Sequence, residues 1–257
     1  MLNCCGSSWQ AWPSCREMLV NHYWKARTSE MPIPKLLHQT AKTADIPERW
    51  KAFQSRVREL HPDWTYRLWT DDDNRELVRR ECPDLFDLFQ KLPKNIMRAD
   101  VIRYVLMYRL GGLYMDLDYE MLKPFDLLQY DLVLPLEPHT YYCNAIFASA
   151  PGHPFFKAVL DELAATPPLD PAVDAVVATG PGLVSRVYRR VGASLANAYT
   201  PESPLFIPMT PRNRREYRRI VDAGVAYGIH HCDGSWREYT FPRKCKEVAY
   251  RIIHRII

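Results

Sequence analysis

The sequence predicts a single α/β domain, and three observations lead to that fold class. Short apolar segments rich in branched and aromatic residues alternate with longer segments of helical periodicity. Around Gly111-Gly112 a helix, a strand and a second strand follow one another directly, which is the order typical of α/β proteins. The chain has 257 residues, of which 47% are hydrophobic and 25% charged. This composition can build a core and excludes the disordered, collagen-like and coiled-coil classes.

Regular patterning begins at residues 31–34, where two prolines frame the start of an apolar run. We therefore expect an N-terminal extension over residues 1–30 and a folded domain over residues 31–257. The predicted strands are residues 35–38, 65–69, 113–118, 131–136 and 144–150. The predicted helices are residues 48–60, 73–81, 85–92, 96–110 and 154–165. Gly111-Gly112 ends the helix over residues 96–110, because glycine adopts the left-handed conformation that closes a helix.

The longest unbroken apolar run in the middle of the chain, Tyr104–Tyr108, is far shorter than the roughly 18 residues of a membrane span. The first fifteen residues contain polar side chains in place of an apolar block, so we expect no cleaved secretion signal. The seven cysteines include no C-x-x-C pair, which favours reduced thiols over a disulfide framework or zinc ribbon. Adjacent Cys4 and Cys5 are candidates for acylation in a eukaryotic host.

The net charge of +4 divides unevenly, because residues 186–257 carry +8 and residues 1–185 carry −4. The densest basic stretch is Arg212–Arg219. Its arginines suit the phosphates of a nucleotide or an anionic membrane surface, and the structural alternative is a solvated helix face. No nucleic-acid-binding motif is present, so nucleic acid is not an expected partner. The expected location is the cytoplasm or a membrane periphery, or the Golgi for a eukaryotic secretory protein.

The most informative motif is Asp116-Leu117-Asp118, at the end of a predicted buried strand. Residues i and i+2 of a strand project from the same face, so the two carboxylates are expected to converge. Two buried carboxylates without a partner would be costly, whereas Mg²⁺ or Mn²⁺ would stabilise them and in turn bind a diphosphate. A D-x-D motif alone is weak, because surface loops produce it often.

Asp100 and Arg103 lie three residues apart on the helix predicted over residues 96–110, and therefore on one face. They are suited to binding a sugar hydroxyl and a phosphate, and a surface ion pair is the structural alternative.

Three segments together resemble the DXD-containing glycosyltransferases of family 32. The segments are Ile33–Thr40, Arg98–Tyr104 and Gly111–Asp118. Later fragments agree in order, namely Asn144, Ala150–Pro154, Thr179–Pro181, His230-His231 and Gly234–Trp236. Within the family the chain is most similar to inositol phosphorylceramide mannosyltransferases, and more distantly to initiating α-1,6-mannosyltransferases and glucosylating bacterial toxins.

The resemblance implies a GT-A fold, which is a Rossmann-like α/β domain with a single mixed central sheet flanked by helices. It implies metal-dependent transfer of a hexose, with retention, from a nucleotide sugar to a glycan or lipid-linked acceptor. Mannose is favoured over glucose or galactose. The implied cofactor is Mn²⁺ or Mg²⁺, and the implied donor is GDP-mannose, with a UDP-hexose as the alternative.

The resemblance also assigns roles to individual residues. The implied catalytic residues are Asp116, Asp118 and Arg103. The implied substrate-binding residues are His38, Gln39, Thr40, Asp100, Arg103, Tyr114, Asp116, Asn144, Gly180, Ser235 and Trp236. The implied metal ligands are Asp118, His231 and Ser235, with His230 as the alternative to His231. Structural roles remain open for the later residues, because histidine pairs often stabilise loops and a lone tryptophan is often part of a core.

Two departures from the family leave questions open. Ala41 follows His-Gln-Thr where relatives commonly have tryptophan, so the base preference is not fixed. The chain ends in Arg251–Ile257 where lipid-modifying relatives carry membrane spans, and we expect this tail to pack as a last helix or rest on an anionic membrane.

The expected chemistry is stabilisation of the departing diphosphate by metal and arginine, with front-face attack by the acceptor, because no residue stands out as a nucleophile. One alternative is a metal-dependent phosphoesterase that uses Asp116, Asp118 and His231. Two-metal enzymes of this kind need a second dense set of Asp and His ligands, and apart from Asp233 the sequence shows none. The other is a transferase fold that binds without turnover.

Overall fold

The computed structural model describes residues 32–137, 141–202, 205–206 and 214–234, without the side chains of residues 214–217. Four predictions lie outside the described residues: the extension over residues 1–30, the acylation of Cys4 and Cys5, the tail, and the site roles of Ser235 and Trp236.

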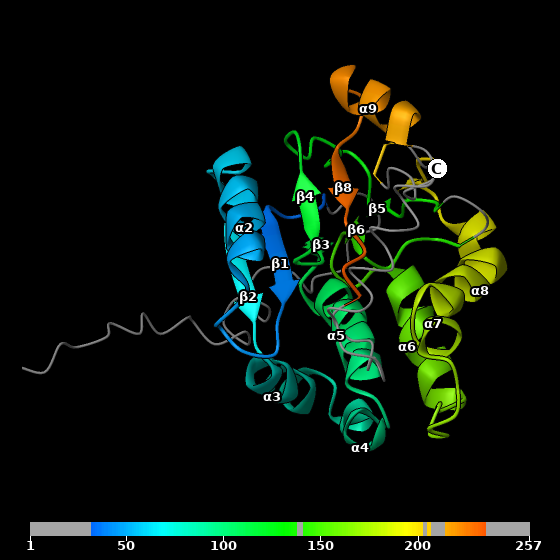
Figure 1. Ribbon diagram of the computed structural model, residues 1–257. Helices are drawn as coiled ribbons and strands as arrows, with labels where there is room; N and C mark the ends of the chain where they lie inside the picture. The colour runs from blue at the N-terminus through cyan, green and yellow to red at the C-terminus, as the bar shows by residue number, and fades with distance from the viewer. Residues whose placement is uncertain (1–31, 138–140, 203–204, 207–213, 235–257) are drawn as a thin grey trace, which may run out of the picture. The chain divides into compact units, whose positions relative to one another are not determined.

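A six-stranded mixed sheet forms the centre of the described domain (Figure 1). Its strand order is β2 (Thr65–Trp69), β1 (Leu36–Thr40), β3 (Gly112–Met115), β6 (Ile146–Ser149), β5 (Leu132–Val133) and β7 (Ala198–Tyr199). Strand β1 is parallel to both of its neighbours, and β6 is antiparallel to both of its own. A separate two-stranded antiparallel sheet pairs β4 (Tyr119–Met121) with β8 (Gly228–His230). The mixed central sheet confirms the predicted fold class, and the two-stranded sheet is an addition to it.

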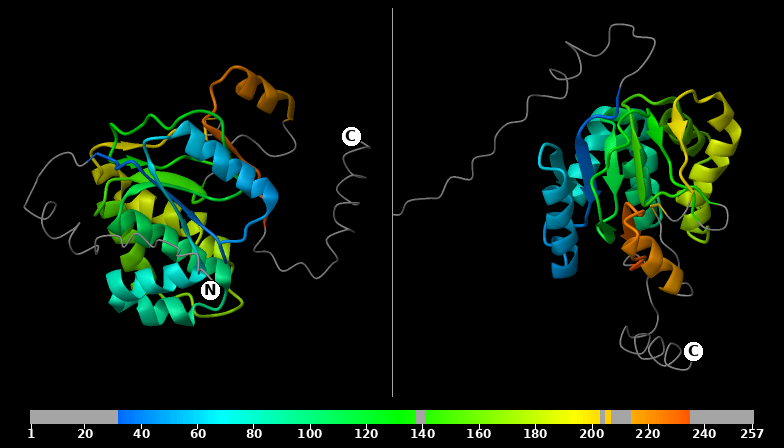
Figure 2. Two further views of the ribbon diagram at one scale, coloured as in Figure 1. Left: turned by 90° about the vertical axis from the view of Figure 1, so that its left-hand side faces the viewer. Right: turned by 90° about the horizontal axis from the view of Figure 1, so that it is seen from above.

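The described residues form the helices α2 (Glu48–Leu60), α3 (Asp71–Glu81), α4 (Pro83–Lys91), α5 (Asn95–Arg109), α6 (Pro154–Ala165), α7 (Ala175–Ala178), α8 (Pro181–Val191), α9 (Arg214–Asp222) and the 3-10 turn η1 (Gly192–Ser194). Helices pack on both faces of the central sheet. Helix α2 covers one face, and α3 to α6 cover the other (Figure 2).

Alternation along β3 divides the core into two layers. Tyr114 packs with Phe147 and the α5 and α6 side chains on one face, whereas Leu113 and Met115 pack with Val57 of α2 on the other. All of these side chains are buried. Because neighbouring strand residues point to opposite faces, a strand covered on both sides must be apolar throughout, as β3 is.

The glycine pair between α5 and β3 confirms the prediction made for it. Gly111 and Gly112 have φ angles of +65° and +99°, and the amide of Gly111 donates to the carbonyls of Leu106 and Met107 at the end of α5. A Cβ atom on Gly112 would lie 2.5 Å from the carbonyl oxygen of Leu36. The chain therefore turns from helix into the central strand where no side chain fits.

The predicted strand over residues 113–118 is too long. Strand β3 ends at Met115, and the amide of Tyr119 donates to the carbonyl of Asp116 at 3.1 Å, which closes a turn. The physical reason is the second sheet, because the chain must leave the central sheet before β4 begins. Asp116 and Asp118 therefore converge through a turn rather than along a strand.

Elsewhere the predicted bounds agree closely with the structure for α2, α6 and β2, and within a few residues for α3, α4, α5 and β6. Strand β5 spans two residues instead of the predicted 131–136. The described cysteines Cys82, Cys143 and Cys232 are free thiols. Across the described ranges, no helix combines the length and apolar character needed to span a bilayer.

Candidate functional site

Arg103 is the centre of a buried polar cluster beside the D-x-D turn. It extends from α5, and one terminal nitrogen donates to the carbonyl of Asn144 at 2.7 Å. The other lies 3.3 Å from Asp116 Oδ1 and 3.7 Å from Asp100 Oδ1. Burial alone would lower the pKa of Arg103, but the adjacent carboxylates raise it above its usual range. Its Nε atom is buried and has no hydrogen-bond partner among the described residues.

Asp100 accepts hydrogen bonds on both of its carboxylate oxygens. Asn144 Nδ2 donates to Oδ1 at 2.9 Å, and Thr179 Oγ1 donates to Oδ2 at 2.8 Å. The side chain is buried, and this burial raises the pKa of Asp100 to about 6. The helix spacing therefore places Asp100 and Arg103 together as predicted, inside the protein rather than as a surface ion pair.

Asp116 is held by a relay of hydroxyl groups. Tyr114 donates its hydroxyl to Asp116 Oδ1 at 2.7 Å, and Thr40 Oγ1 lies 3.0 Å from the same Tyr114 hydroxyl. Burial raises the pKa of Asp116 against the opposing charge of Arg103. Gln39 Nε2 donates to the backbone carbonyl of Asp116 at 3.3 Å. The carboxyl ends of β1 and β3 thus converge on one carboxylate.

Asp118 faces the histidine that ends β8. Its Oδ1 lies 3.4 Å from His230 Nε2, and its Oδ2 accepts the amide of Asp233 at 2.8 Å. Burial raises the pKa of Asp118, but His230 and the Asp233 amide outweigh that effect and hold it below its usual value. In His230, burial lowers the pKa, while Asp118 and Cys232 raise it well above normal. Asp116, Asp118 and His230 offer metal-binding atoms within 4.8 Å of one another.

His231, implied as a metal ligand, lies away from this group. Its Nε2 is 2.8 Å from Glu120 Oε2, and its ring stacks on Phe53 of α2 with centroids 5.0 Å apart. The reason is the pairing of β8 with β4, in which His230 lies opposite Tyr119. Successive residues of extended chain point to opposite sides, so only one of the two histidines can face the carboxylates. The structure places His230 there.

His38, implied as a nucleotide-binding residue, makes two hydrogen bonds within the protein. Its Nε2 lies 3.0 Å from the carbonyl of Gly111, and its Nδ1 accepts the indole N–H of Trp69 at 3.1 Å. Burial lowers the pKa of His38 to about 4, so the ring is neutral and donates through Nε2. Both ring nitrogens are used by the protein, and the nucleotide contact implied for His38 stays a prediction.

Gly180 precedes α8, directly after the Thr179 that binds Asp100. A Cβ atom there would lie 3.1 Å from the carbonyl of Val176, so the residue allows close packing of backbone. Its contact with a donor also stays a prediction.

Two acidic residues near the site were not predicted. Burial raises the pKa of Glu137, and the nearby Cys143 thiol and His230 offset that effect only in part. Asp233 donates its backbone amide to the Asp118 carboxylate. Glu137 lies in no motif, whereas Asp233 stands between the fragments His230-His231 and Gly234–Trp236, although nothing local predicts which groups it would contact.

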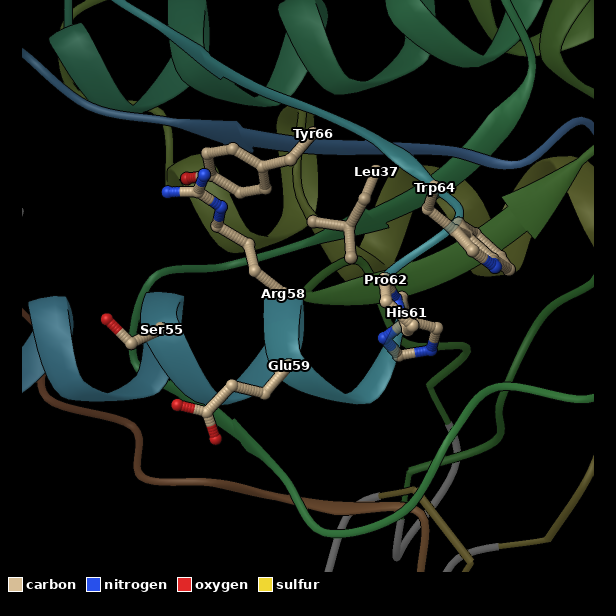
Figure 3. A pocket seen from close by; sticks show the side chains of 8 residues that line it. All are labelled: Leu37, Ser55, Arg58, Glu59, His61, Pro62, Trp64 and Tyr66. Atoms are coloured by element: carbon tan, nitrogen blue, oxygen red, sulfur yellow. The ribbon is translucent and has the colours of Figure 1, made fainter.

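A cavity of about 480 Å³ lies between α2 and strands β1 and β2 (Figure 3). Its lining residues are Leu37, Ser55, Arg58, Glu59, His61, Pro62, Trp64 and Tyr66. The guanidinium of Arg58 lies over the ring of Tyr66, at 5.4 Å from its centroid. None of these residues belongs to the Arg103 cluster or the D-x-D turn, so the cavity is separate from the candidate site.

Comparison with protein families identifies the region that contains the four charged residues of the cluster and the D-x-D turn. Residues 47–135 match the family described as "glycosyltransferase sugar-binding region containing DXD motif". The match includes Asp100, Arg103, Asp116 and Asp118. This part of the chain resembles the sugar-binding region of DXD-containing glycosyltransferases. The described fold agrees with this result, because the central sheet and the D-x-D turn lie within one α/β domain of GT-A type.

Two curated yeast proteins show similarity to this region and its surroundings. Inositol phosphoceramide mannosyltransferase 2 of Schizosaccharomyces pombe is 35% identical over 173 residues, which cover 66% of this chain and 50% of that protein. Mannosyl phosphorylinositol ceramide synthase SUR1 of Saccharomyces cerevisiae is 41% identical over 132 residues, which cover 51% of this chain and 35% of that protein. The chain thus spans half or less of the length of these relatives.

A solved structure supports the fold. The PaToxG glycosyltransferase superposes with a TM-score of 0.50 and 16% sequence identity, covering 63% of this chain and 70% of that chain. At this identity the similarity shows a shared glycosyltransferase fold and no more.

Proposed function

We propose that the protein is a metal-dependent, retaining glycosyltransferase that moves a hexose from a nucleotide sugar to a hydroxyl of a glycan or lipid-linked acceptor. The observation that carries the proposal is the convergence of Asp116, Asp118 and His230 within 4.8 Å, next to the buried guanidinium of Arg103. Mannose is the favoured sugar, because the similar yeast proteins are named as an inositol phosphoceramide mannosyltransferase and a mannosyl phosphorylinositol ceramide synthase. GDP-mannose is then the favoured donor, with UDP-hexoses as the alternative.

The donor set fits a divalent cation. Two carboxylates and one imidazole nitrogen suit Mn²⁺, and the carboxylates also suit Mg²⁺. In the protein alone, His230 stands opposite Asp118 and compensates its charge. Asp116, Asp118 and His230 would hold the ion. Ser235, which lies outside the described residues, stays a further candidate ligand. When bound, the ion neutralises charge on the diphosphate leaving group.

The remaining residues bind and orient the donor. Asp100 and Asp116 offer acceptors for ribose and sugar hydroxyls, and Arg103 supplies fixed positive charge for the departing phosphate. The relay from Thr40 through Tyr114 holds the Asp116 carboxylate in place. In front-face attack, the bond from the anomeric carbon to the diphosphate oxygen breaks as the acceptor oxygen bonds to that carbon. The acceptor proton passes to the leaving phosphate.

The acceptor class follows from the names of the relatives, which act on inositol phosphoceramide. A sugar alcohol attached to a lipid is therefore the acceptor that we propose to test first. The membrane contact implied for the basic C-terminal region stays a prediction. Of the arginines in Arg212–Arg219, the structure describes the side chains of Arg218 and Arg219, which are exposed.

The phosphoesterase alternative lacks support. Two-metal hydrolases use a second ligand cluster about 4 Å from the first. Within the ranges that the structure describes, Asp116, Asp118 and His230 are the one group of three or more acidic, histidine or cysteine side chains suited to an ion.

The test measures release of nucleoside diphosphate from GDP-mannose, UDP-glucose and UDP-galactose, with Mn²⁺ or with EDTA. We expect one donor to be cleaved with metal, and Asp118→Asn to lose at least about 100-fold in rate, since it removes a metal-binding charge in the leaving-group region. Asp161→Asn is the matched control, because Asp161 is an exposed carboxylate whose one ion-pair partner among the described residues is Lys157 on α6. Equal rates for Asp118→Asn and wild type would refute the proposal, as would absence of both cleavage and binding for every donor.

A further inference from the structure

The segment His230–Asp233, called here the closing segment, contacts Asp118 three times. His230 Nε2 lies 3.4 Å from Asp118 Oδ1, and the amide of Asp233 donates to Oδ2 at 2.8 Å. The amide of His231 donates to the backbone carbonyl of Asp118 at 3.0 Å. Backbone and side chain of Asp118 are therefore both fixed by one short segment more than 100 residues later in the chain.

The closing segment has little structure of its own to hold it there. Strand β8 pairs with β4 over three residues only. Cys232, two residues after the end of β8, has a φ of 50°. Residues other than glycine adopt this left-handed conformation at a cost in free energy. A short edge pairing followed by an unfavourable backbone conformation needs an additional anchor.

Helix α2 provides that anchor through its first turn. Arg49 donates to Asp233 Oδ1 at 3.0 Å, and the indole N–H of Trp50 donates to Asp233 Oδ2 at 2.9 Å. One turn later, Phe53 stacks on the ring of His231 at an interplanar angle of 9°. Three residues of one helix thus bind two residues of the closing segment.

The backbone amide of Asp233 faces Asp118, whereas its carboxylate is bound by α2. A third carboxylate near Asp116 and Asp118 would repel both of them. Arg49 and Trp50 hold the Asp233 carboxylate against α2, while its amide N–H points to Asp118. The site thereby gains a hydrogen-bond donor from Asp233 without gaining its negative charge.

We propose that Arg49 and Trp50 are positioning residues, which act through Asp233 to hold His230 and Asp118 in register for a divalent cation. The role of this register in catalysis rests on the proposed glycosyltransferase function. The anchoring itself does not, because its contacts are present in the protein without a ligand.

The primary test is hydrogen exchange of the metal-free, 257-residue chain. The amides of His231 and Asp233 are the reporters, since both donate to Asp118. In Trp50→Phe, which keeps an aromatic ring and removes the indole donor, we expect both amides to exchange about 10-fold or more faster, as loss of a charge-assisted hydrogen bond implies. Asp233→Asn keeps an acceptor oxygen for one of the two donors but loses the negative charge, so its effect should be at least as large. Arg56→Gln is the matched control, because Arg56 is an exposed arginine of α2 that, within the part of the chain that the structure describes, pairs with Glu59 alone.

The second readout is binding of Mn²⁺ alone, measured by electron paramagnetic resonance. We expect Trp50→Phe to weaken binding about 10-fold and Arg56→Gln to leave it within about twofold. In Asp233→Ala, adding Trp50→Phe should cause no further loss, because the partner of the indole is already gone. Such non-additivity distinguishes positioning from general loss of stability.

The outcomes separate this inference from the proposed function. Unchanged exchange at His231 and Asp233 in Trp50→Phe overturns the anchoring, whatever the protein catalyses. Additive effects in the double variant overturn it as well. Wild-type protein that binds neither Mn²⁺ nor a donor refutes the proposed function, and the exchange result still decides the anchoring.

Discussion

The buried imidazole of His38 should make the stability of this domain depend on pH. His38 lies between the carbonyl of Gly111 and the indole of Trp69, and it joins β1 to the turn before β3 and to β2. Burial lowers its pKa from 6.5 to about 4. The folded protein therefore resists protonation of a ring that the unfolded chain protonates readily.

The sign and size of the effect follow from this difference. As the pH falls from about 6.5 to about 4, the unfolded state binds the proton and the folded state does not, so stability decreases. A difference of about 2.5 pKa units corresponds to about 3 kcal/mol at pH 4, of which about 2 kcal/mol is lost by pH 5. Against a total stability of about 5–15 kcal/mol, that loss is large.

The assay is urea denaturation from pH 7.5 to pH 4, comparing wild type with His38→Gln, which keeps an N–H donor and an oxygen acceptor. The variant is less stable at neutral pH, but its free energy of unfolding should fall less steeply, so the two curves approach by about 3 kcal/mol at pH 4. The comparison is needed because the pKa of His153 is also lowered to about 4 by burial, and this residue adds the same slope to both proteins. Parallel curves would refute the assignment of His38 as a buried neutral ring.

Two further substitutions test the packing around the site by urea denaturation. Gly112→Ala should cost about 2–4 kcal/mol, because a Cβ atom there meets the Leu36 carbonyl at 2.5 Å on top of a φ of +99°. Gly152→Ala, at φ +72° with nothing within 4 Å, isolates the backbone cost of about 1–2 kcal/mol, and equal losses would contradict the steric argument. Thr179→Val should cost about 1–3 kcal/mol, because it removes the donor to buried Asp100 Oδ2. An unchanged stability would show that this hydrogen bond is replaced.

Local periodicity was enough to predict much of the fold. The bounds of α2, β2 and α6 follow from helical spacing, aromatic alternation and flanking prolines, which act within a few residues. The same is true of the Gly111-Gly112 turn, whose left-handed conformations no other residue pair adopts as easily. Strand β5 is shorter than predicted, and strands β7 and β8 were not predicted, because short strands gain their stability from pairing rather than from their own sequence.

In the candidate site, too, some contacts follow from the local sequence and others depend on the tertiary structure. The sequence by itself determined that Asp100 and Arg103 share a helix face and that Asp116 and Asp118 lie together after the glycine pair, because these relations span at most three residues. Only the tertiary structure decided that Asn144 and Thr179 bind Asp100, that His230 rather than His231 faces Asp118, and that Asp233 is anchored on α2. Those contacts depend on the register of β4 with β8 and on helix packing across more than 40 residues. Such pairings are fixed by burial of the whole domain, and no local pattern encodes them.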